Sequence, residues 1–170
     1  LFLYHENDNS LQRLTTVEGM SESNPTALAW DEDGEILMVG YASGKLDLFS
    51  NSGDWLYTFN DIPQSNLIGD KSILQLMWGG PNDPDMVYAA CGFGIVAMNI
   101  RSLDVRDTWY LEGQQNLRRC DGIAVQDAGN AAPIYVVWTD AGVFEAPTNH
   151  PFLSSPEAWT RWSDIPLETA

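Results

Sequence analysis

Basic residues are scarce in this chain of 170 residues, which has two lysines and six arginines against 24 acidic residues. The formal net charge is −16, and the basic residues are scattered along the sequence. A nucleic-acid-binding surface needs a basic stripe that neutralises phosphates, and an anionic membrane surface repels a chain of this charge. The composition therefore excludes both partners. It predicts an acidic, solvated surface, with a carboxylate-rich cation site as the less favoured alternative.

Long apolar runs and recognisable catalytic motifs are also absent. No run of about 18 apolar residues occurs, so no segment is predicted to insert into a membrane. His5 and His150 lie far in sequence from either cysteine, and no metal-ligand spacing is present. A Gly-x-Ser-x-Gly motif is missing, and Gly92-Phe-Gly94 has too few glycines for a dinucleotide-binding fingerprint. We therefore predict that the domain has no enzymatic activity and no cofactor.

Two acidic turns are the places where a cation site would be sought. One runs from Asp31 to Glu35, and the other contains Asn82, Asp83 and Asp85. Neither has the ligand spacing of an EF-hand loop. Both are predicted to be turns with solvated carboxylates.

Three similar apolar stretches, each divided by a tight glycine turn, run through the chain. They cover residues 37–49, 86–100 and 134–146, and their aligned glycines are Gly44, Gly94 and Gly142. These glycines are 50 and 48 residues apart. A second landmark, formed by Trp30, Trp78 and Val125, recurs at intervals of 48 and 47 residues. Two landmarks with one period indicate a structural repeat, and this length is typical of propeller blades.

Each repeat unit predicts four strands separated by turn residues. An inner strand comes first, the glycine-centred pair follows, and an aromatic outer strand ends the unit. Small residues of the inner strand, such as Ala27, Ala29 and Ala124, suit the crowded centre of a ring, whereas aromatic residues fill its wider rim. No helical periodicity of useful length competes with this pattern. The sequence therefore predicts an all-β fold, a β-propeller of four-stranded antiparallel blades.

The phase of the repeat predicts a partial ring. Leu1 aligns with the residue directly after the hairpin glycine, so the first unit is expected to lack two strands. The single domain, 1–170, is predicted to contain a half blade at 1–15 and full blades at 26–60, 73–111 and 122–163. Propellers close with about 4–8 blades. We therefore expect further blades from sequence outside this chain, or a second copy, to cover the open faces. Because residue 1 is Leu, we expect a mature or trimmed piece, which does not argue against export.

The chain resembles known propellers in several segments. Residues 15–34 resemble a repeat of the two-component-regulator type, with Gly40-Tyr-Ala-Ser-Gly44 as its hairpin. More narrowly, nearly the whole chain resembles the N-terminal propeller of PorZ proteins. The segments that carry this resemblance are residues 37–48, 67–72, 91–96, 105–110 and 159–162. Its most specific part is Gly-Phe-Gly-Ile-Val at 92–96 followed by Asp-Thr-Trp-Tyr at 107–110.

The resemblance carries expectations about function. PorZ proteins are components of the type IX secretion system of Bacteroidota. It implies an exported, non-catalytic interaction domain, associated with the cell surface and outer membrane or periplasmic, in a sortase-containing attachment complex. The implied partners are other proteins of that complex and an anionic lipopolysaccharide. No catalytic motif of the family maps onto residues of this chain. Two alternatives stay open: a ligand-sensing propeller of a periplasmic two-component or hybrid sensor regulator, and a polysaccharide-active propeller enzyme.

Four residues are candidate ligand-binding residues. Arg118 and Arg119 form an adjacent basic pair on the predicted face of the glycine hairpins, where they could bind a phosphate or carboxylate group. The favoured alternative is an ordinary salt-bridged loop pair. Phe93 and Trp138 are predicted near the same face, either as stacking platforms or, in the favoured alternative, as buried hairpin packing.

Cys91 and Cys120 form a candidate disulfide. Cys91 begins a hairpin turn of one predicted blade, and Cys120 precedes the inner strand of the next, on the same face. Cysteines of an exported protein tend to pair, whereas two separately buried thiols are the alternative. A bridge requires a Cα–Cα separation below about 7 Å.

Overall fold

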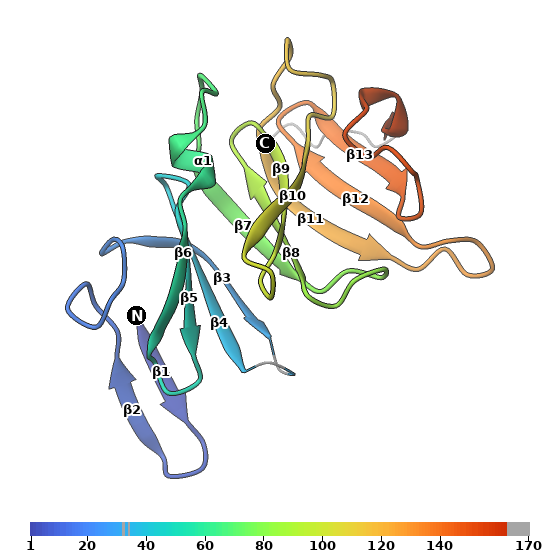
Figure 1. Ribbon diagram of the computed structural model, residues 1–170. Coiled ribbons are helices and arrows are strands. Elements are labelled where there is room, and N and C mark those ends of the chain that lie inside the picture. The colour runs from blue at the N-terminus through green and yellow to red at the C-terminus, as the bar shows by residue number, and fades with distance from the viewer. Residues whose placement is uncertain (32, 34, 163–170) are drawn as a thin grey trace, which may run out of the picture.

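The computed structural model describes residues 1–31, 33 and 35–162, and it consists almost entirely of antiparallel sheets (Figure 1). The first sheet contains two strands, and each of the next three contains four. The strands of the first two sheets are β1 (Phe2–His5), β2 (Ser10–Arg13), β3 (Pro25–Asp31), β4 (Ile36–Tyr41), β5 (Leu46–Ser50) and β6 (Trp55–Phe59). Those of the last two are β7 (Ile73–Trp78), β8 (Met86–Cys91), β9 (Gly94–Asn99), β10 (Asp104–Trp109), β11 (Cys120–Gln126), β12 (Ile134–Thr139), β13 (Gly142–Pro147) and β14 (Thr160–Arg161).

Two short helical turns interrupt this pattern. The helix α1 (Asp61–Gln64) follows β6, and the 3-10 helix η1 (Pro156–Ala158) precedes β14. Among the described residues, neither is long and apolar enough to cross a membrane. The predicted acidic turn from Asp31 lies partly beyond what can be described, because Glu32 and Gly34 are outside the described residues.

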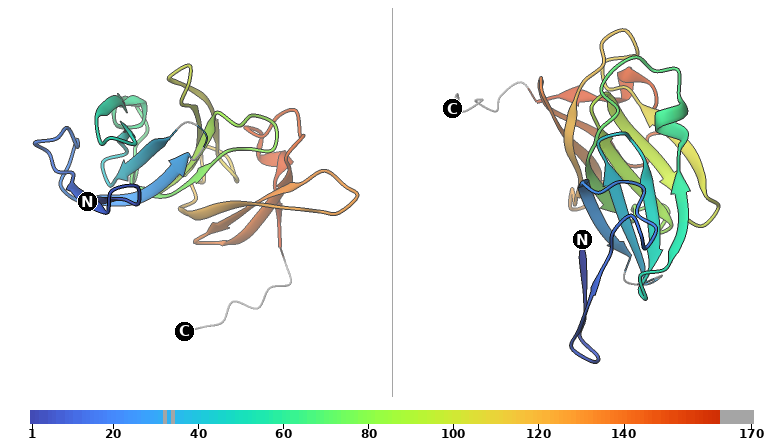
Figure 2. Two further views of the ribbon diagram at one scale, coloured as in Figure 1. Left: turned by 90° about the horizontal axis from the view of Figure 1, so that it is seen from below. Right: turned by 90° about the vertical axis from the view of Figure 1, so that its left-hand side faces the viewer.

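The three four-stranded sheets share one topology. In each, strands that follow one another in sequence pair as antiparallel neighbours. In the central pairs, Gly40 pairs with Leu46, Ala90 with Ile95, and Trp138 with Val143, so the β4–β5 hairpin is one residue longer than the other two. The sheets stand side by side in an arc, with β1–β2 at one end and β11–β14 at the other (Figures 1 and 2). The fold prediction is confirmed: the described residues form a partial β-propeller and no closed ring.

Alternation along each strand divides the core into layers between successive sheets. In β8, Val87, Ala89 and Cys91 join the core shared with the second sheet. Met86, Tyr88 and Ala90 of the same strand join the core shared with the fourth sheet. All six residues are buried, as expected for a sheet that is covered on both faces.

Hydrogen bonds at intervals close to the repeat length link neighbouring sheets. The Thr26 hydroxyl donates to the carbonyl oxygen of Ile73 at 2.6 Å, and the Ile123 amide donates to Oε1 of Gln75 at 2.9 Å. Farther out, the hydroxyls of Tyr88 and Tyr135 lie 3.0 Å apart in the core. The first two bonds fix β3 against β7 and β7 against β11, and the third joins β8 to β12.

Candidate functional site

The adjacent arginines are paired with carboxylates that are near them in sequence. Arg118 Nε pairs with Glu112, and both side chains are about three-quarters buried. Arg119 Nε donates to Oδ1 of Asp121 at 2.7 Å. The hydrogen bond and charge of Asp121, with Asp70 and Asp140 nearby, raise the pKa of Arg119. An anionic ligand would therefore meet a neutralised pair that is surrounded by further carboxylates.

The two aromatic candidates lie in different surroundings. Phe93 is 3% exposed and packs beside Tyr110, with ring centroids 6.3 Å apart. Trp138 is 45% exposed and occupies the same register position in the fourth sheet as buried Ala90 in the third. It lies on the face that points away from the third sheet, because its neighbour Val137 belongs to the shared core. The equivalent residue of the third sheet, Ala90, packs in the core shared with the following sheet. Trp138 therefore occupies a position at which a following blade would pack.

The candidate disulfide is a prediction that the structure corrects, because Cys91 and Cys120 are free thiols. They belong to different cores: Cys91 lies with the second sheet and Cys120 with the fourth, on opposite faces of the third. Each thiol donates to a nearby backbone oxygen, Cys91 to Ala89 at 3.5 Å and Cys120 to Arg118 at 3.6 Å. Burial raises the pKa of both, that of Cys120 to about 12.

We predict that both thiols are unreactive in the folded protein. The thiolate is the reacting form, and burial disfavours it at Cys91 and Cys120. Titration with a chromogenic disulfide at pH 8 should modify neither residue in buffer and both in denaturant. Because the folded pKa of Cys120 is raised from 9.0 to about 12, its contribution to stability is present below pH 9.0 and is lost as the pH rises toward 12. Rapid native modification would contradict this prediction.

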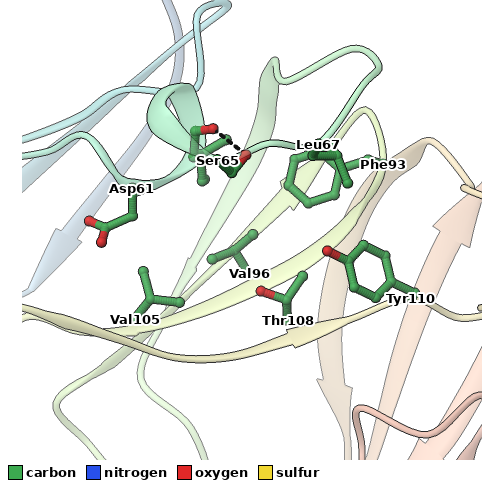
Figure 3. A pocket seen from close by; sticks show the side chains of 9 residues that line it. Asp61, Ser65, Leu67, Phe93, Val96, Val105, Thr108 and Tyr110 are labelled. Atoms are coloured by element: carbon green, nitrogen blue, oxygen red, sulfur yellow. Dashed lines mark hydrogen bonds between the residues drawn. The ribbon is translucent and has the colours of Figure 1, made fainter. Parts of the chain in front are cut away.

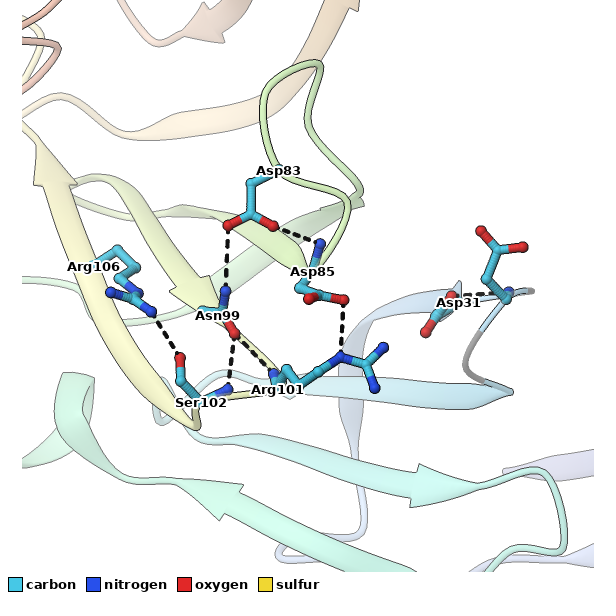
Figure 4. Close-up of polar contacts among 8 residues, drawn as sticks. Asp31, Asp83, Asp85, Asn99, Arg101, Ser102 and Arg106 are labelled. Atoms are coloured by element: carbon cyan, nitrogen blue, oxygen red, sulfur yellow. Dashed lines mark hydrogen bonds and ion pairs between the residues drawn. The ribbon is translucent and has the colours of Figure 1, made fainter.

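Polar residues at one end of the third sheet brace turns. Asp83 accepts from the amide of Asp85 at 2.9 Å and from Asn99 Nδ2 at 3.4 Å (Figure 4). Asp85 accepts from Arg101 Nε at 3.1 Å, and the Asn99 side chain accepts the amide of Arg101 at 2.9 Å. Among the described residues, no three His, Cys, Asp or Glu side chains gather around a site for a metal ion.

A pocket lies at the other end of the third sheet, where the connection after β6 packs on the neighbouring blade. Ile62 of α1 is buried in the shared core, and Gly44 leaves room for it, since a Cβ there would lie 2.6 Å from Ile62 Cγ2. The Lys71 ammonium donates to the carbonyl oxygens of Pro63 at 3.0 Å and Ser65 at 2.8 Å. These contacts hold the connection between the second and third sheets in one conformation.

The pocket has a volume of about 190 Å³ and walls that are mostly apolar. Its lining comes from α1 and the residues after it, from the β8–β9 turn, and from β9 and β10: Asp61, Ile62, Ser65, Leu67, Phe93, Val96, Val105, Thr108 and Tyr110. Figure 3 shows Asp61 at one side and Tyr110 at the other, with the Tyr110 hydroxyl turned toward Thr108. The site therefore combines an apolar interior with one carboxylate and hydroxyl groups.

A second, shallower depression of about 510 Å³ continues from this pocket. The two share Ser65, Leu67 and Tyr110. The second adds two amide side chains and two apolar ones: Asn66, Gln114, Ile68 and Leu117. Ile68 is 94% exposed, so its apolar side chain is available for contact beside the pocket. We call the two depressions together the α1 groove.

Of the four predicted ligand residues, the α1 groove contains Phe93, whereas Arg118, Arg119 and Trp138 do not line it. The other lining residues were not predicted. The adjacent apolar residues Leu67 and Ile68, in a connection rich in polar residues, are the sequence signal that could have drawn attention to it.

Comparisons with known proteins give the fold and the family. The chain is similar to the extracellular domain of a hybrid two-component system from B. thetaiotaomicron, with a TM-score of 0.63, 16% identity and coverage of 89% of this chain and 18% of that one. It is similar to Sqt1 of Saccharomyces cerevisiae (TM-score 0.55, 16% identity, coverage 83% and 36%) and to the computationally designed Ika8 protein (TM-score 0.51, 18% identity, coverage 81% and 36%). At these identities the likeness shows the fold alone, and the chain spans a fifth to about a third of those structures.

A search of curated proteins gave no match. The family model described as "TSS9, PorZ, N-terminal beta-propeller domain" matches residues 1–160. The repeat of four-stranded antiparallel blades agrees with a β-propeller domain. The chain therefore belongs to the family of PorZ N-terminal β-propeller domains.

Proposed function

We propose that this propeller is a non-catalytic interaction domain of an exported, PorZ-like component of the type IX secretion system. In this proposal it acts at the cell surface within a sortase-containing attachment complex, and the α1 groove is where it contacts another protein of that complex. The family match over residues 1–160 supports the system, and the groove supports the mode of action.

The observation that carries the proposal is the α1 groove, which combines an apolar pocket with an exposed apolar residue. Polar groups outside the groove serve turns and links between sheets, and no buried side-chain nitrogen or oxygen among the described residues lacks a hydrogen-bond partner. Unsatisfied buried polar groups and metal clusters are typical marks of a reaction centre. An exposed apolar residue next to an apolar pocket is instead typical of a protein contact.

Exchange of the chromosomal allele in the source bacterium tests the function. Ile68→Glu places a charge in the groove, and because Ile68 is 94% exposed, the substitution should leave folding unchanged. We expect surface-attached cargo of the secretion system, measured by flow cytometry, to fall several-fold. Val17→Glu is the matched control, since Val17 is 89% exposed and lies outside the groove.

The outcomes separate the proposal from its alternatives. Unchanged cargo display after deletion of the gene, together with an altered transcriptional response, would favour the ligand-sensing regulator. Turnover of a polysaccharide by the purified protein would favour the enzyme. If deletion removes display but Ile68→Glu does not, the contact with the complex lies outside the α1 groove.

A further inference from the structure

We infer that the α1 groove binds an extended peptide segment in which an apolar side chain is followed or preceded by Lys or Arg. This inference rests on the proposed function, because it names the chemistry of the partner at the same groove. It is argued from the size of the pocket, the groups around it and their charge.

The size of the pocket matches one side chain. Its volume of about 190 Å³ lies below the range of about 300–1,000 Å³ that holds a drug-sized ligand. Its apolar walls include Val96, Val105 and Phe93, which belong to the sheet and its hairpin. A pocket of this kind accepts an apolar anchor of a partner, as the central pockets of protein interfaces do.

The shallower depression suits the main chain next to that anchor. Asn66 and Gln114 offer amide donors and acceptors along it, and Tyr110 belongs to both depressions. Ile68 and Leu117 supply apolar contact on the same surface. A peptide backbone therefore finds both hydrogen-bonding groups and apolar cover beyond the pocket.

The charge of the groove favours a basic neighbour. Asp61 is the one acidic or basic side chain among the described residues that line the two depressions. The nearby cations are engaged: Lys71 donates to the carbonyl oxygens of Pro63 and Ser65, and Arg118 pairs with Glu112. With a net charge of −16 on the chain as a whole, an acidic segment is repelled and a basic one is attracted.

Selection from a phage-displayed library of random heptapeptides on the full-length protein tests the inference. We expect enriched peptides to share an apolar residue next to Lys or Arg. A synthetic peptide of the enriched sequence should bind Asp61→Asn at least about fivefold and Asp61→Lys at least about tenfold more weakly. Asp54→Lys, an exposed substitution outside the groove, should leave its affinity within about twofold.

Three outcomes would overturn the inference: no enrichment of the apolar–basic pair, an affinity that Asp61→Asn leaves unchanged, or an equal loss in Asp54→Lys. The isosteric Asp61→Asn variant keeps the test valid if Asp61→Lys fails to fold. Cargo display that depends on Ile68 without a basic preference in the peptides would reject the ligand chemistry and leave the proposed function standing. A basic preference with normal cargo display in Ile68→Glu cells would leave the ligand chemistry standing and reject the α1 groove as the contact with the complex.

Discussion

Replacement of Asp47 by Ala is expected to lower the free energy of unfolding by about 3–5 kcal/mol. Asp47 lies on β5 with no exposed surface. Its carboxylate accepts hydrogen bonds from the amide and hydroxyl of Ser21, each at 2.7 Å, from the Tyr41 hydroxyl at 2.7 Å and from the Thr58 hydroxyl at 2.6 Å. The Thr58 hydroxyl in turn accepts from Trp55 Nε1 at 2.9 Å. Removal of the carboxylate leaves buried donors without an acceptor, which costs more than the bonds themselves contribute.

This network anchors the connection from β2 into β3 to the second sheet, because Ser21 belongs to that connection. Urea unfolding should show the loss, and proteolysis within residues 1–24 should become faster as that connection is released. Asp104→Ala is the matched control, since Asp104 is half-exposed and pairs with Arg106 at 3.3 Å. Its cost should stay below about 1 kcal/mol. An Asp47→Ala protein as stable as the Asp104→Ala protein would show that the network does not hold this connection on the second sheet.

Substitution of each of the three repeated hairpin glycines by Ala is expected to lower the free energy of unfolding, by an amount that differs between the positions. All three have positive φ, +88° for Gly44, +155° for Gly94 and +117° for Gly142, so each substitution costs about 1–3 kcal/mol in backbone strain. Crowding adds to this at two of them. A Cβ at Gly94 would lie 2.4 Å from the carbonyl oxygen of Trp109, and one at Gly44 would lie 2.8 Å from that of Lys71.

Gly142 is the control within the same repeat position. A Cβ there would meet Nε of the Arg161 side chain at 3.3 Å, and that side chain is exposed and can move away. Denaturant unfolding should rank Gly142→Ala as the least destabilised of the three variants. The free energy of unfolding of the other two should be lower by about a further 1 kcal/mol or more, which is the cost of overpacking a core site. Equal losses of stability at all three positions would mean that backbone strain alone sets the cost. The close contacts beside Gly44 and Gly94 would then make no measurable contribution.

The sequence predicted the blades well because their determinants are local and repeated. The glycines with positive φ, the alternating apolar residues and the turn residues each act within a few positions. The same unit is therefore recognisable three times in the sequence and forms three four-stranded sheets in the fold. The partial ring was predicted for the same reason, from the alignment of Leu1 with the residue after a hairpin glycine. In the structure this segment forms β1, which pairs with β2 alone.

The α1 groove could not be predicted, because it depends on how a non-repeating connection packs on the neighbouring blade. Neither the position of Ile62 in the core nor the bonds of Lys71 to Pro63 and Ser65 follow from local pattern. The cysteine pair shows the same limit. Strand counting placed Cys91 and Cys120 on one face of the propeller, but the Cys91 side chain packs in the core shared with the second sheet and Cys120 in the core shared with the fourth. The pairing of Arg118 with Glu112 agrees with the salt-bridged alternative that the acidic composition favoured.

Site-specific photocrosslinking in living cells tests the central claim most directly. A photoreactive amino acid replaces Ile68 in the α1 groove or, as the control, Val17 outside it, both highly exposed positions. The account predicts an adduct from position 68 with a protein of the attachment complex, identified by mass spectrometry, which is lost when the gene of the sortase component is deleted. It predicts no such adduct from position 17. Equal adducts from both positions, or none from position 68 in cells that display cargo normally, would contradict the claim that this propeller acts through the α1 groove.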